Sequence, residues 1–455
     1  MKWLQSCWWK RIGLAVLGVL LAIAFYGLLQ LIEPVAIAPI IPSSQPFAFT
    51  GSALLVASDA DMVATAYADG VLNRVPGIED TLTVIDLPLN PQNPSIREVQ
   101  VSNSVASWPQ IIAASSNGTR AFVAEVRGRP PDSVQEYDSI DQLPAGTQVT
   151  AVDLSQAQLK AIATLEVGQN PEHLGLSPDG TLLAVTLDQP GEELALIQII
   201  NGTFGERFNF AMPEIEGQPA SARSVVWHPS GQYLALNLNN RAVAFYQVQR
   251  DAQGNPTLQP QGEPIRVGNW LTAGRFTSDG RFYLIPDVKW RTYGIRQLDY
   301  LMNPKGALIA IAFTPTEQSQ VTSIVEVGLG PEGFAISPDD SLAVTVNLRR
   351  TYLPNWLPAW RGKPYSSLSL IAIDRTSGEL TPIDEYGFEG LLPEQGTFDA
   401  AGNSLAVVIY HNREETPTTG AVEFWRVVKG NRPRLERTGL TLDVVRGAHD
   451  IVLIP

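Results

Sequence analysis

The chain is poor in the residues that build most metal and redox centres. It holds a single cysteine, Cys7, and four histidines among 455 residues. One cysteine excludes an internal disulfide framework and any metal site built from several cysteines, and four histidines leave little material for a polyhistidine metal centre. The sequence also lacks a glycine-rich phosphate loop, a G-x-S-x-G nucleophile elbow and an H-E-x-x-H zinc motif. The best-known signatures of nucleotide-binding proteins, serine hydrolases and zinc proteases are therefore absent.

Positive charge is also scarce. The chain has 32 Lys and Arg residues against 46 Asp and Glu residues, which gives a net charge of −14. Such an acidic chain is a poor candidate for binding nucleic acid through its phosphates. Hydrophobic residues make up 44 % and charged residues 17 %, so the chain is neither disordered nor a bundle of charged surface helices.

Turn-forming residues, in contrast, are abundant. The 37 glycines and 34 prolines are spread along the chain without a collagen-like period. This density predicts many short elements joined by tight turns.

A long apolar run occupies residues 12–32, where Gln30 is the one polar side chain. At about 1.5 Å per residue the run would span roughly 30 Å, the thickness of the hydrocarbon core. The residues before it are typical of a cytoplasmic membrane flank: Lys2, Lys10, Arg11, Trp3, Trp8 and Trp9. The pattern predicts an uncleaved, single-pass anchor with residues 1–11 in the cytoplasm. The rest of the chain would then lie on the other side of the membrane, in a periplasm or a lumen.

A cleaved signal peptide is the alternative interpretation of this segment. Ala36-Ile37-Ala38 offers a small-x-small cleavage site, but Pro39 would follow the cut and disfavours it. Under the preferred interpretation, residues 33–49 are a proline-rich tether of moderate stiffness between the anchor and a domain that spans residues 50–455.

A repeat runs through this domain. Its clearest copies are residues 170–187 and 330–347, each with an apolar strand, a four-residue turn and a second strand rich in Ala, Val and Leu. In the first copy Pro178 presets φ at the corner, Asp179 can bond back to the backbone, and Gly180 accepts a positive φ. Further copies occupy residues 107–126, 221–238, 271–287 and 392–410, with a degenerate one at 52–68.

Each hairpin is followed by a third strand, at residues 81–87, 147–154, 194–200, 242–248, 308–313, 367–374 and 421–427, and then by a more polar fourth strand. The seven turns begin at Ser58, Ser115, Ser177, His228, Thr277, Ser337 and Asp399. Four antiparallel strands repeated in this way predict an all-β fold, a seven-bladed β-propeller. A solenoid or a chain of two sandwiches could carry such strands too, but the uniform repeat favours the propeller.

Closure of the ring can be predicted only in part. Residues 447–455 read as a lone copy of the first strand, so we expect the C-terminus to add a strand to the N-terminal blade. Residues 52–57 also resemble a first strand, and the register of closure stays open between the two.

The repeat resembles the YVTN-type propeller repeat in Pro331, Ser337-Pro338-Asp339 and Val344-Thr345-Val346-Asn347. Residues 222–231 (ARSVVWHPSG) are similar to a motif of lactonase-type propellers, G-P-R-H-x-x-F-H-P-x-G. The resemblance covers residues 50–455 and implies the fold and an extracytoplasmic bacterial protein. Ser224 stands where that motif has its first histidine, and Leu238 stands after Asn237, where a catalytic glutamate would be expected.

Strand order predicts a ring of polar residues around the mouth of the central channel. The corners between the fourth strand of one blade and the first strand of the next carry Gln110, Glu172, Arg223, Thr272, Glu332, Glu394 and His449, and His173 follows Glu172. Converging carboxylates could hold Ca²⁺ or raise one another's pKa for acid/base chemistry. Alternatively, the residues of this ring are solvated turn residues, and His173 packs inside the blade.

Long insertions, at residues 69–80, 127–146, 289–305, 348–364 and 411–420, should lie on the same face. Two of them carry basic and aromatic residues that would form a partner-binding patch: Lys289, Trp290, Arg291, Tyr293, Arg349, Arg350, Tyr352, Trp356, Trp360 and Arg361. A surface that faces lipid headgroups is one alternative. Aromatic residues that fill their own loops are the other.

These features lead to two hypotheses about function. The first is a membrane-anchored, non-enzymatic propeller that binds a protein, a glycan or a small molecule through its looped face. The second is a lactonase-like hydrolase in which Glu172, Arg223, Glu332 or His449 supplies acid/base and anion-stabilising groups, with a divalent cation such as Ca²⁺ as a possible addition. No other cofactor is evident.

Overall fold

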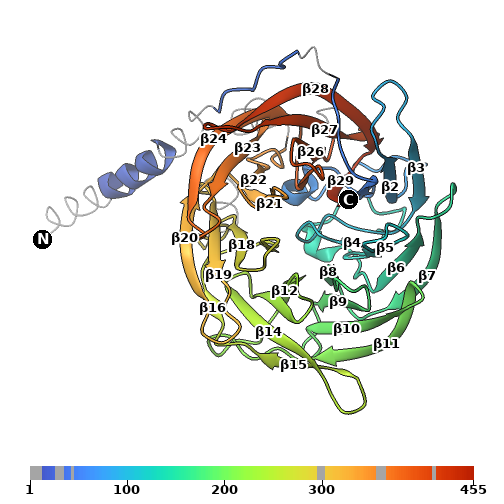
Figure 1. Cartoon of the computed structure of the whole chain (residues 1–455). Helices are drawn as coiled ribbons and strands as arrows, with labels where there is room; N and C mark the ends of the chain where they lie inside the picture. Colours follow the sequence, from blue (N-terminus) through green and yellow to red (C-terminus); the bar gives the residue numbers. More distant parts are fainter. Residues whose placement is uncertain (1–12, 26–34, 43–45, 295–302, 355–364, 412–416) are drawn as a thin grey trace, which may run out of the picture.

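The computed structural model describes residues 13–25, 35–42, 46–294, 303–354, 365–411 and 417–455. Its strands form seven antiparallel sheets arranged radially around a central axis (Figure 1). The predicted all-β, seven-bladed propeller is confirmed.

Six blades follow one another along the chain, each with its innermost strand first. Blades 2 and 3 are β4 (Ile112–Ala114), β5 (Arg120–Ala124), β6 (Gln148–Asp153) and β7 (Lys160–Glu166), then β8 (Pro171–Leu176), β9 (Leu182–Leu187), β10 (Leu194–Ile200) and β11 (Thr203–Phe210). Blades 4 and 5 are β12 (Ala222–Trp227), β13 (Tyr233–Leu238), β14 (Ala242–Arg250) and β15 (Pro256–Pro260) with the added β16 (Ile265–Arg266), then β17 (Arg275–Phe276), β18 (Phe282–Asp287), β19 (Ala307–Ala312) and β20 (Gln320–Glu326). Blades 6 and 7 are β21 (Pro331–Ile336), β22 (Leu342–Asn347), β23 (Tyr365–Ile373) and β24 (Leu380–Glu389), then β25 (Gly396–Phe398), β26 (Ser404–Ile409), β27 (Thr419–Val428) and β28 (Arg434–Val445).

The remaining blade, blade 1, closes the ring. Its order is β29 (Ala448–Ile454), β1 (Ala53–Ser58), β2 (Thr81–Asp86) and β3 (Ile96–Gln100), so the C-terminal strand is innermost and the N-terminal strand lies beside it. Leu54 faces Leu453 and Val56 faces Ile451 across this junction. The C-terminus therefore adds the closing strand as predicted, and β1 is the second strand of its blade and not the first.

The turn chemistry predicted from the repeat is present in blades 2 to 7. In each turn the N–H of the first residue donates to the carbonyl five residues later, as in Ser177 to Leu182 (2.8 Å), His228 to Tyr233 (2.9 Å) and Asp399 to Ser404 (2.9 Å). Gly180 adopts φ 71°, which a glycine accepts at little cost.

The degenerate copy at residues 52–68 departs from this pattern. The predicted hairpin does not form, because β29 already occupies the edge of β1 that its second strand would need. The chain after Ser58 instead becomes a long loop with one short helix, α2 (Ala66–Asp69). Two buried carboxylates hold this loop, since Asp80 accepts the N–H of Ala60 at 2.9 Å and Asp59 accepts that of Val105 at 2.9 Å.

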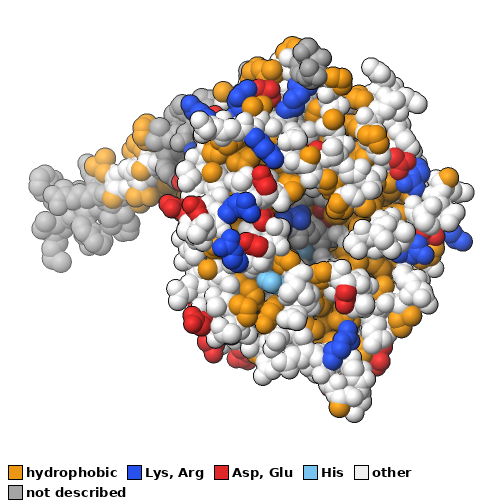
Figure 2. Space-filling model, viewed as in Figure 1, with side chains coloured by type: hydrophobic (Ala, Val, Ile, Leu, Met, Phe, Trp, Pro, Cys, Tyr) orange, Lys and Arg blue, Asp and Glu red, His pale blue; other side chains and the backbone are white. Residues whose placement is uncertain are grey.

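The core lies between neighbouring sheets. Apolar side chains from blades 1, 2 and 3 form one continuous buried cluster that includes Leu55, Phe122 and Val185, each at most 1 % exposed. Small residues alternate with large ones along the strands, which lets the twisted sheets approach one another. The face seen in Figure 2 is hollowed at its centre and carries interspersed acidic and basic side chains.

The segment predicted as a tether is attached to the outside of the ring. Ala38 donates its N–H to Gly387 in β24 (2.8 Å), and Ile41 donates to Arg437 in β28 (2.9 Å). A Cβ at Gly387 would lie 2.9 Å from the carbonyl oxygen of Ala36, so the close approach requires glycine. Residues 35–42 therefore extend the outer edges of blades 6 and 7 and are not a free linker.

Residues 13–25 are helical. Among the described residues, none of the helices combines the length and the apolar character needed to cross a bilayer. Residue 12 and residues 26–32 of the predicted anchor lie outside the described part of the chain, and the anchor stays a prediction.

Candidate functional site

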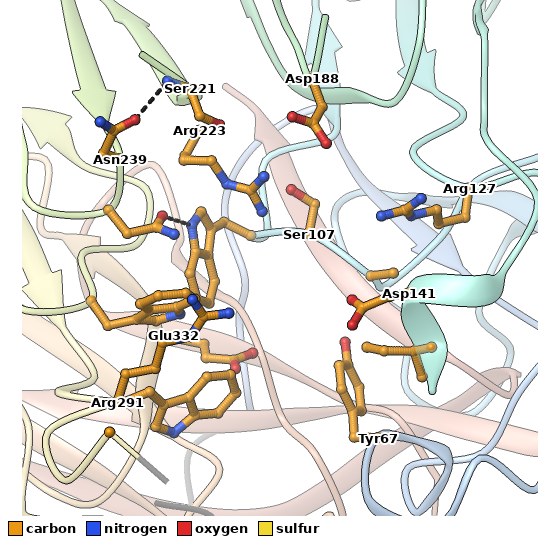
Figure 3. Close-up of a pocket in the computed structure, with 17 residues that line it drawn as sticks. Tyr67, Ser107, Arg127, Asp141, Asp188, Ser221, Arg223, Asn239, Arg291 and Glu332 are labelled. Carbon is orange, nitrogen blue, oxygen red and sulfur yellow. Dashed lines mark hydrogen bonds between the residues drawn. The ribbon is translucent and has the colours of Figure 1, made fainter. Parts of the chain in front are cut away.

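A cavity of about 690 Å³ opens on the face that carries the long insertions. Arg223 and Glu332 reach it from innermost strands, Tyr67 from the loop after β1, and Arg127 and Arg291 from insertions (Figure 3). Three tryptophans add flat apolar surface to its wall: Trp108, Trp270 and Trp290. Concave sites with a few convergent polar groups among aromatic side chains are typical of small-molecule binding.

A shared backbone irregularity places four of the predicted residues. Glu172, Arg223, Glu332 and His449 are each skipped by the pairing register between the first and second strands of their blades. For example, Pro331 faces Asn347 and Gly333 faces Val346, which leaves Glu332 without a partner residue. A bulge of this kind redirects a side chain out of the sheet, and bulges are over-represented beside active sites.

The other predicted corner residues directly precede an innermost strand. Gln110 lies before β4, Thr272 before β17 and Glu394 before β25, and all three are at least nine-tenths buried. Four of the seven predicted positions thus lie at bulges inside innermost strands and three lie shortly before such a strand. Of the seven, only Arg223 and Glu332 line the cavity within the described part of the chain.

Arg223 is paired with Glu172 from the preceding blade. Its Nη1 lies 2.9 Å from Oε1 of Glu172, and Ser107 donates its hydroxyl to Oε2 at 2.6 Å. The Glu172 carboxylate is 1 % exposed, and these two donors compensate its burial. Arg223 is thereby fixed with its guanidinium at the cavity wall, opposite Arg127 (Figure 3).

Glu332 and Glu394 form a buried carboxyl pair. They are 5 % and 0 % exposed, and the ionisation of each carboxyl depends on the other. Burial raises the pKa of Glu332 to about 8. Burial, followed by repulsion from Glu332, raises the pKa of Glu394 well above its usual range. Neither oxygen of Glu394 has a hydrogen-bond partner in the described part of the chain, and at neutral pH the raised pKa values keep both carboxyls largely protonated.

This pair predicts a pH dependence of stability. Both carboxyls ionise near pH 4.5 in the unfolded chain, whereas in the folded protein the pKa of Glu332 is about 8 and that of Glu394 is also well above its usual range, so the folded state binds more protons above pH 4.5. The stability that the pair contributes is complete below pH 4.5 and is lost as the pH rises through 8. Each raised pKa unit corresponds to about 1.4 kcal/mol.

We therefore expect the free energy of unfolding to fall between pH 5 and pH 8, and Glu394→Gln to reduce that fall by several kcal/mol. Urea unfolding curves at both pH values provide the measurement. The exposed Glu206→Gln on β11 serves as the control. An unchanged slope in Glu394→Gln would contradict the raised pKa of Glu394. Asp59, whose pKa burial raises to about 7, should leave a residual fall in the variant.

The two predicted channel histidines are buried and neutral. His173 is 0 % exposed, with Nε2 2.9 Å from the side-chain amide of Gln110. His449 is 1 % exposed, with Nε2 2.8 Å from Oδ1 of Asn103. Burial lowers the pKa of each to about 3. Neither lines the cavity, so the expectation that His449 lies at the channel mouth as an acid or base is not met.

The predicted basic and aromatic patch folds largely inward. Tyr352 and Arg350 are 1 % and 5 % exposed, and Arg349 lies 3.9 Å from Glu385. The expectation of a single exposed patch therefore fails for these residues, because their loop packs over the ring. Trp290 packs on Trp108 with ring centroids 6.3 Å apart.

The rest of the patch divides between the cavity wall and the surface. Trp290 and Arg291 line the cavity, and Tyr293 is 38 % exposed. Lys289 is half-buried. Trp356, Trp360 and Arg361 lie outside the described residues.

Other residues of the wall were not predicted. Tyr67 lies in the degenerate repeat copy, which the sequence pattern assigned to a hairpin, and its hydroxyl donates to the carbonyl of Val105 at 2.7 Å. Trp108 precedes β4 and donates its indole N–H to Asn240 at 3.2 Å. Trp270 and Arg127 lie in connections that do not repeat. The sequence signal that could have pointed to these wall residues was the presence of aromatic residues in loops beside the predicted corners.

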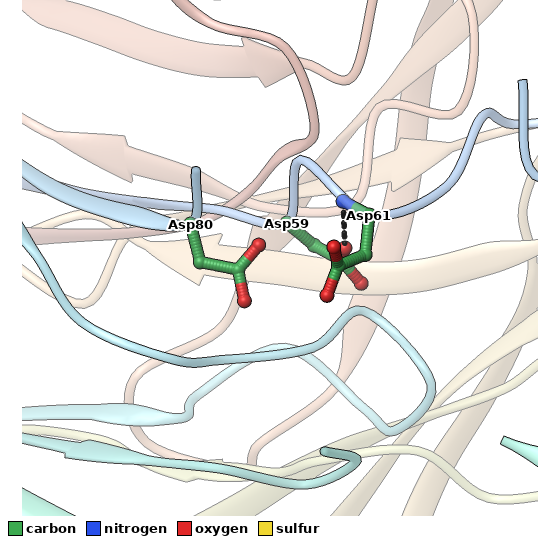
Figure 4. Close-up of side chains that lie close together, drawn as sticks. All are labelled: Asp59, Asp61 and Asp80. Carbon is green, nitrogen blue, oxygen red and sulfur yellow. Dashed lines mark hydrogen bonds between the residues drawn. The ribbon is translucent and has the colours of Figure 1, made fainter. Parts of the chain in front are cut away.

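Three further carboxylates gather near the closing blade. Potential ligand oxygens of Asp59, Asp61 and Asp80 lie within 4.8 Å of one another (Figure 4). Both oxygens of Asp59 and of Asp80 accept backbone N–H groups, so these side chains brace the loop after β1. Within the described residues the channel-mouth carboxylates form no such group of three, and Ca²⁺ at the mouth stays a prediction.

Known structures with the same fold include lactonases. The chain superposes on the periplasmic gluconolactonase of Pseudomonas aeruginosa with a TM-score of 0.60 and 17 % identity, over 89 % of this chain and 99 % of that one. It superposes on candidate 6-phosphogluconolactonases of Bacteroides uniformis (TM-score 0.57, 12 % identity, 88 % and 99 % covered) and Bacteroides fragilis (0.57, 14 %, 91 % and 100 %).

Comparisons of sequence add nothing to this, since no family profile and no curated protein matches the chain. At these identities the structural likeness establishes the fold alone, a seven-bladed β-propeller. The finer resemblance to YVTN-type repeats stays a prediction.

Proposed function

We propose that the protein is a lactonase-like hydrolase that opens the ring of a small lactone in the cavity of about 690 Å³. The observation that carries the proposal is the buried Glu332–Glu394 pair, which places one carboxyl with a pKa of about 8 at the wall of the cavity that Arg223 also lines. Perturbed carboxyls in a cleft are characteristic of acid/base catalysis.

The chemistry follows from these groups. Ionised Glu332 accepts a proton from a water molecule, and the water oxygen attacks the lactone carbonyl carbon. The guanidinium groups of Arg223 and Arg127 face the cavity and stabilise the oxyanion that develops. When the ring C–O bond breaks, protonated Glu332 returns the proton to the leaving alkoxide. One lactone and one water thus become one hydroxy acid, and Glu332 ends in its starting state.

This assignment moves the acid/base group away from the position that the lactonase-type motif implies. Asn237 in β13 is 0 % exposed and donates to the carbonyls of Leu271 and Thr272 at 3.0 and 2.9 Å, which is a structural role. Leu238 beside it is also fully buried. A glutamate is instead available at the bulge of blade 6, which is consistent with the same fold carrying its chemistry on another blade.

The non-enzymatic binding module is the second candidate. Its proposed partner surface is weakened by the burial of Arg350 and Tyr352. The membrane anchor and the extracytoplasmic location depend on residues 12–32 and remain proposals. Hydrolysis in the cavity does not depend on which side of the membrane the protein lies.

The test is turnover of a panel of γ- and δ-lactones by the full-length protein, followed by titration of the released acid. We expect activity in the wild type and a loss of about 10²–10³-fold in kcat/KM for Arg223→Ala, because an oxyanion-stabilising donor is removed. Arg223→Lys keeps a charge beside buried Glu172 and should retain part of the activity while preserving the fold. Arg250→Ala, on an exposed strand end, is the matched control. Absence of turnover in the wild type, with and without Ca²⁺, would refute the proposal.

A further inference from the structure

The cavity continues into a second hollow toward the outside of the ring. This outer hollow has a volume of about 380 Å³ and lies against blade 4 and its connection to blade 5. Asn239, Trp270 and Arg291 line both spaces. The two hollows are therefore neighbouring compartments of one cleft, with the Trp270–Arg291 pair between them.

The dividing wall is held rigidly. The guanidinium of Arg291 lies 4.2 Å from the ring centroid of Trp270. Asp287, which is 4 % exposed, accepts the backbone N–H groups of Trp270 and Lys289, each at 2.9 Å. The N–H of Val288 donates to the carbonyl of Trp270 at 3.1 Å. One buried carboxylate thus fixes both sides of the pair, and a fixed aromatic surface can stack a ligand at low entropic cost.

The outer compartment combines both signs of charge. Glu214, Glu263 and Arg241 are exposed along it, and the Arg266–Glu216 ion pair (2.7 Å) completes the lining. Carboxylates accept hydrogen bonds and guanidinium groups donate them, so together they suit a neutral ring with several hydroxyl groups. Arg291 is exposed and its guanidinium lies over the Trp270 ring, so the pair offers a surface against which such a ring can pack. An alkyl tail would bury these charged groups without partners, which is costly.

We infer that the preferred substrate has two rings: a lactone ring beside Glu332, joined to a neutral sugar ring that crosses the Trp270–Arg291 pair into the outer compartment. A disaccharide aldonolactone has this chemistry. The inference rests on the proposed function for the reaction at the first ring, but the binding of the second ring is independent of it.

The experiment compares one-ring and two-ring ligands on the full-length protein. Hydrolysis of glucono-δ-lactone is measured against that of the maltobionic and cellobionic acid lactones, and binding of the corresponding open-chain acids is measured by calorimetry. We expect kcat/KM to be at least 10-fold higher for one of the two-ring lactones, mainly through a lower KM. Trp270→Ala should remove this preference, while Trp270→Phe should keep most of it because a ring face is retained.

The possible outcomes separate the two proposals. Equal kcat/KM and equal affinity for one-ring and two-ring ligands would overturn the inference and leave the hydrolase intact. Tight binding of a two-ring acid without turnover of any lactone would support the second subsite and refute the hydrolase. A preference for lactones with alkyl tails over both sugar lactones would also overturn the inference.

Discussion

Deletion of residues 448–455 is expected to abolish cooperative folding of the ring. These residues are β29, the innermost strand of blade 1, which pairs with β1 from Ala53↔Ile454 to Ser58↔Ala448. Without β29 the inner edge of β1 is unpaired and blades 1, 2 and 7 lose a shared wall. Ile451 and Ile454 are 0 % and 4 % exposed, and each such side chain contributes about 1.5–3 kcal/mol. The free energy lost with these side chains and with the hydrogen bonds between β29 and β1 is comparable to the total stability of about 5–15 kcal/mol of a typical protein.

Thermal unfolding followed by circular dichroism, together with size-exclusion chromatography, provides the measurement. Removal of Pro455 alone is the control, because this residue is exposed and only its carbonyl is engaged, by Ser52. A truncated chain that melts at the wild-type temperature would show that the ring closes without β29, in contradiction to the assigned topology.

Glu332→Gln is expected to lower lactone hydrolysis by about 10²–10⁴-fold, the usual contribution of a general base. Gln keeps the shape of the side chain but cannot accept the proton of the attacking water. In the wild type the base must be ionised, and burial raises the pKa of Glu332 to about 8. The rate should therefore rise with pH, with its midpoint near 8, and not fall.

The pH profile also tests the role of Glu394, which does not line the cavity. Glu394→Gln replaces the carboxyl beside Glu332 with a neutral amide that can donate a hydrogen bond to ionised Glu332. The midpoint of the rate should then move to lower pH while maximal turnover is largely kept. Glu206→Gln should change neither quantity. If Glu332→Gln retains full activity, or if the profile of Glu394→Gln coincides with that of the wild type, the pair has no part in the reaction.

The sequence was informative about the site wherever the repeat extends. Aligning the copies placed Glu172, Arg223 and Glu332 at equivalent corners, and the structure shows each at the same bulge. It could not show that Glu332 and Glu394 are buried together, because their separation depends on how two neighbouring blades pack. The patch of Arg349 to Tyr352 was misjudged for a similar reason, since local composition does not reveal that a loop folds back over the ring.

By itself the sequence determined the number of blades, their four antiparallel strands and the side of the ring on which the turns lie. These are local properties, set by hydrophobic alternation and by the short turns, such as Pro178-Asp179-Gly180, that join the first two strands of blades 2 to 7. Tertiary structure decided the closing register, because residues 52–58 and 448–454 both read as inner strands and only ring geometry assigns one to each place. It also decided which polar residues meet. The scarcity of histidine and cysteine leaves carboxylates and arginines as the candidate groups for any chemistry. Burial between blades then raises the pKa of one of these carboxyls, Glu332, to about 8.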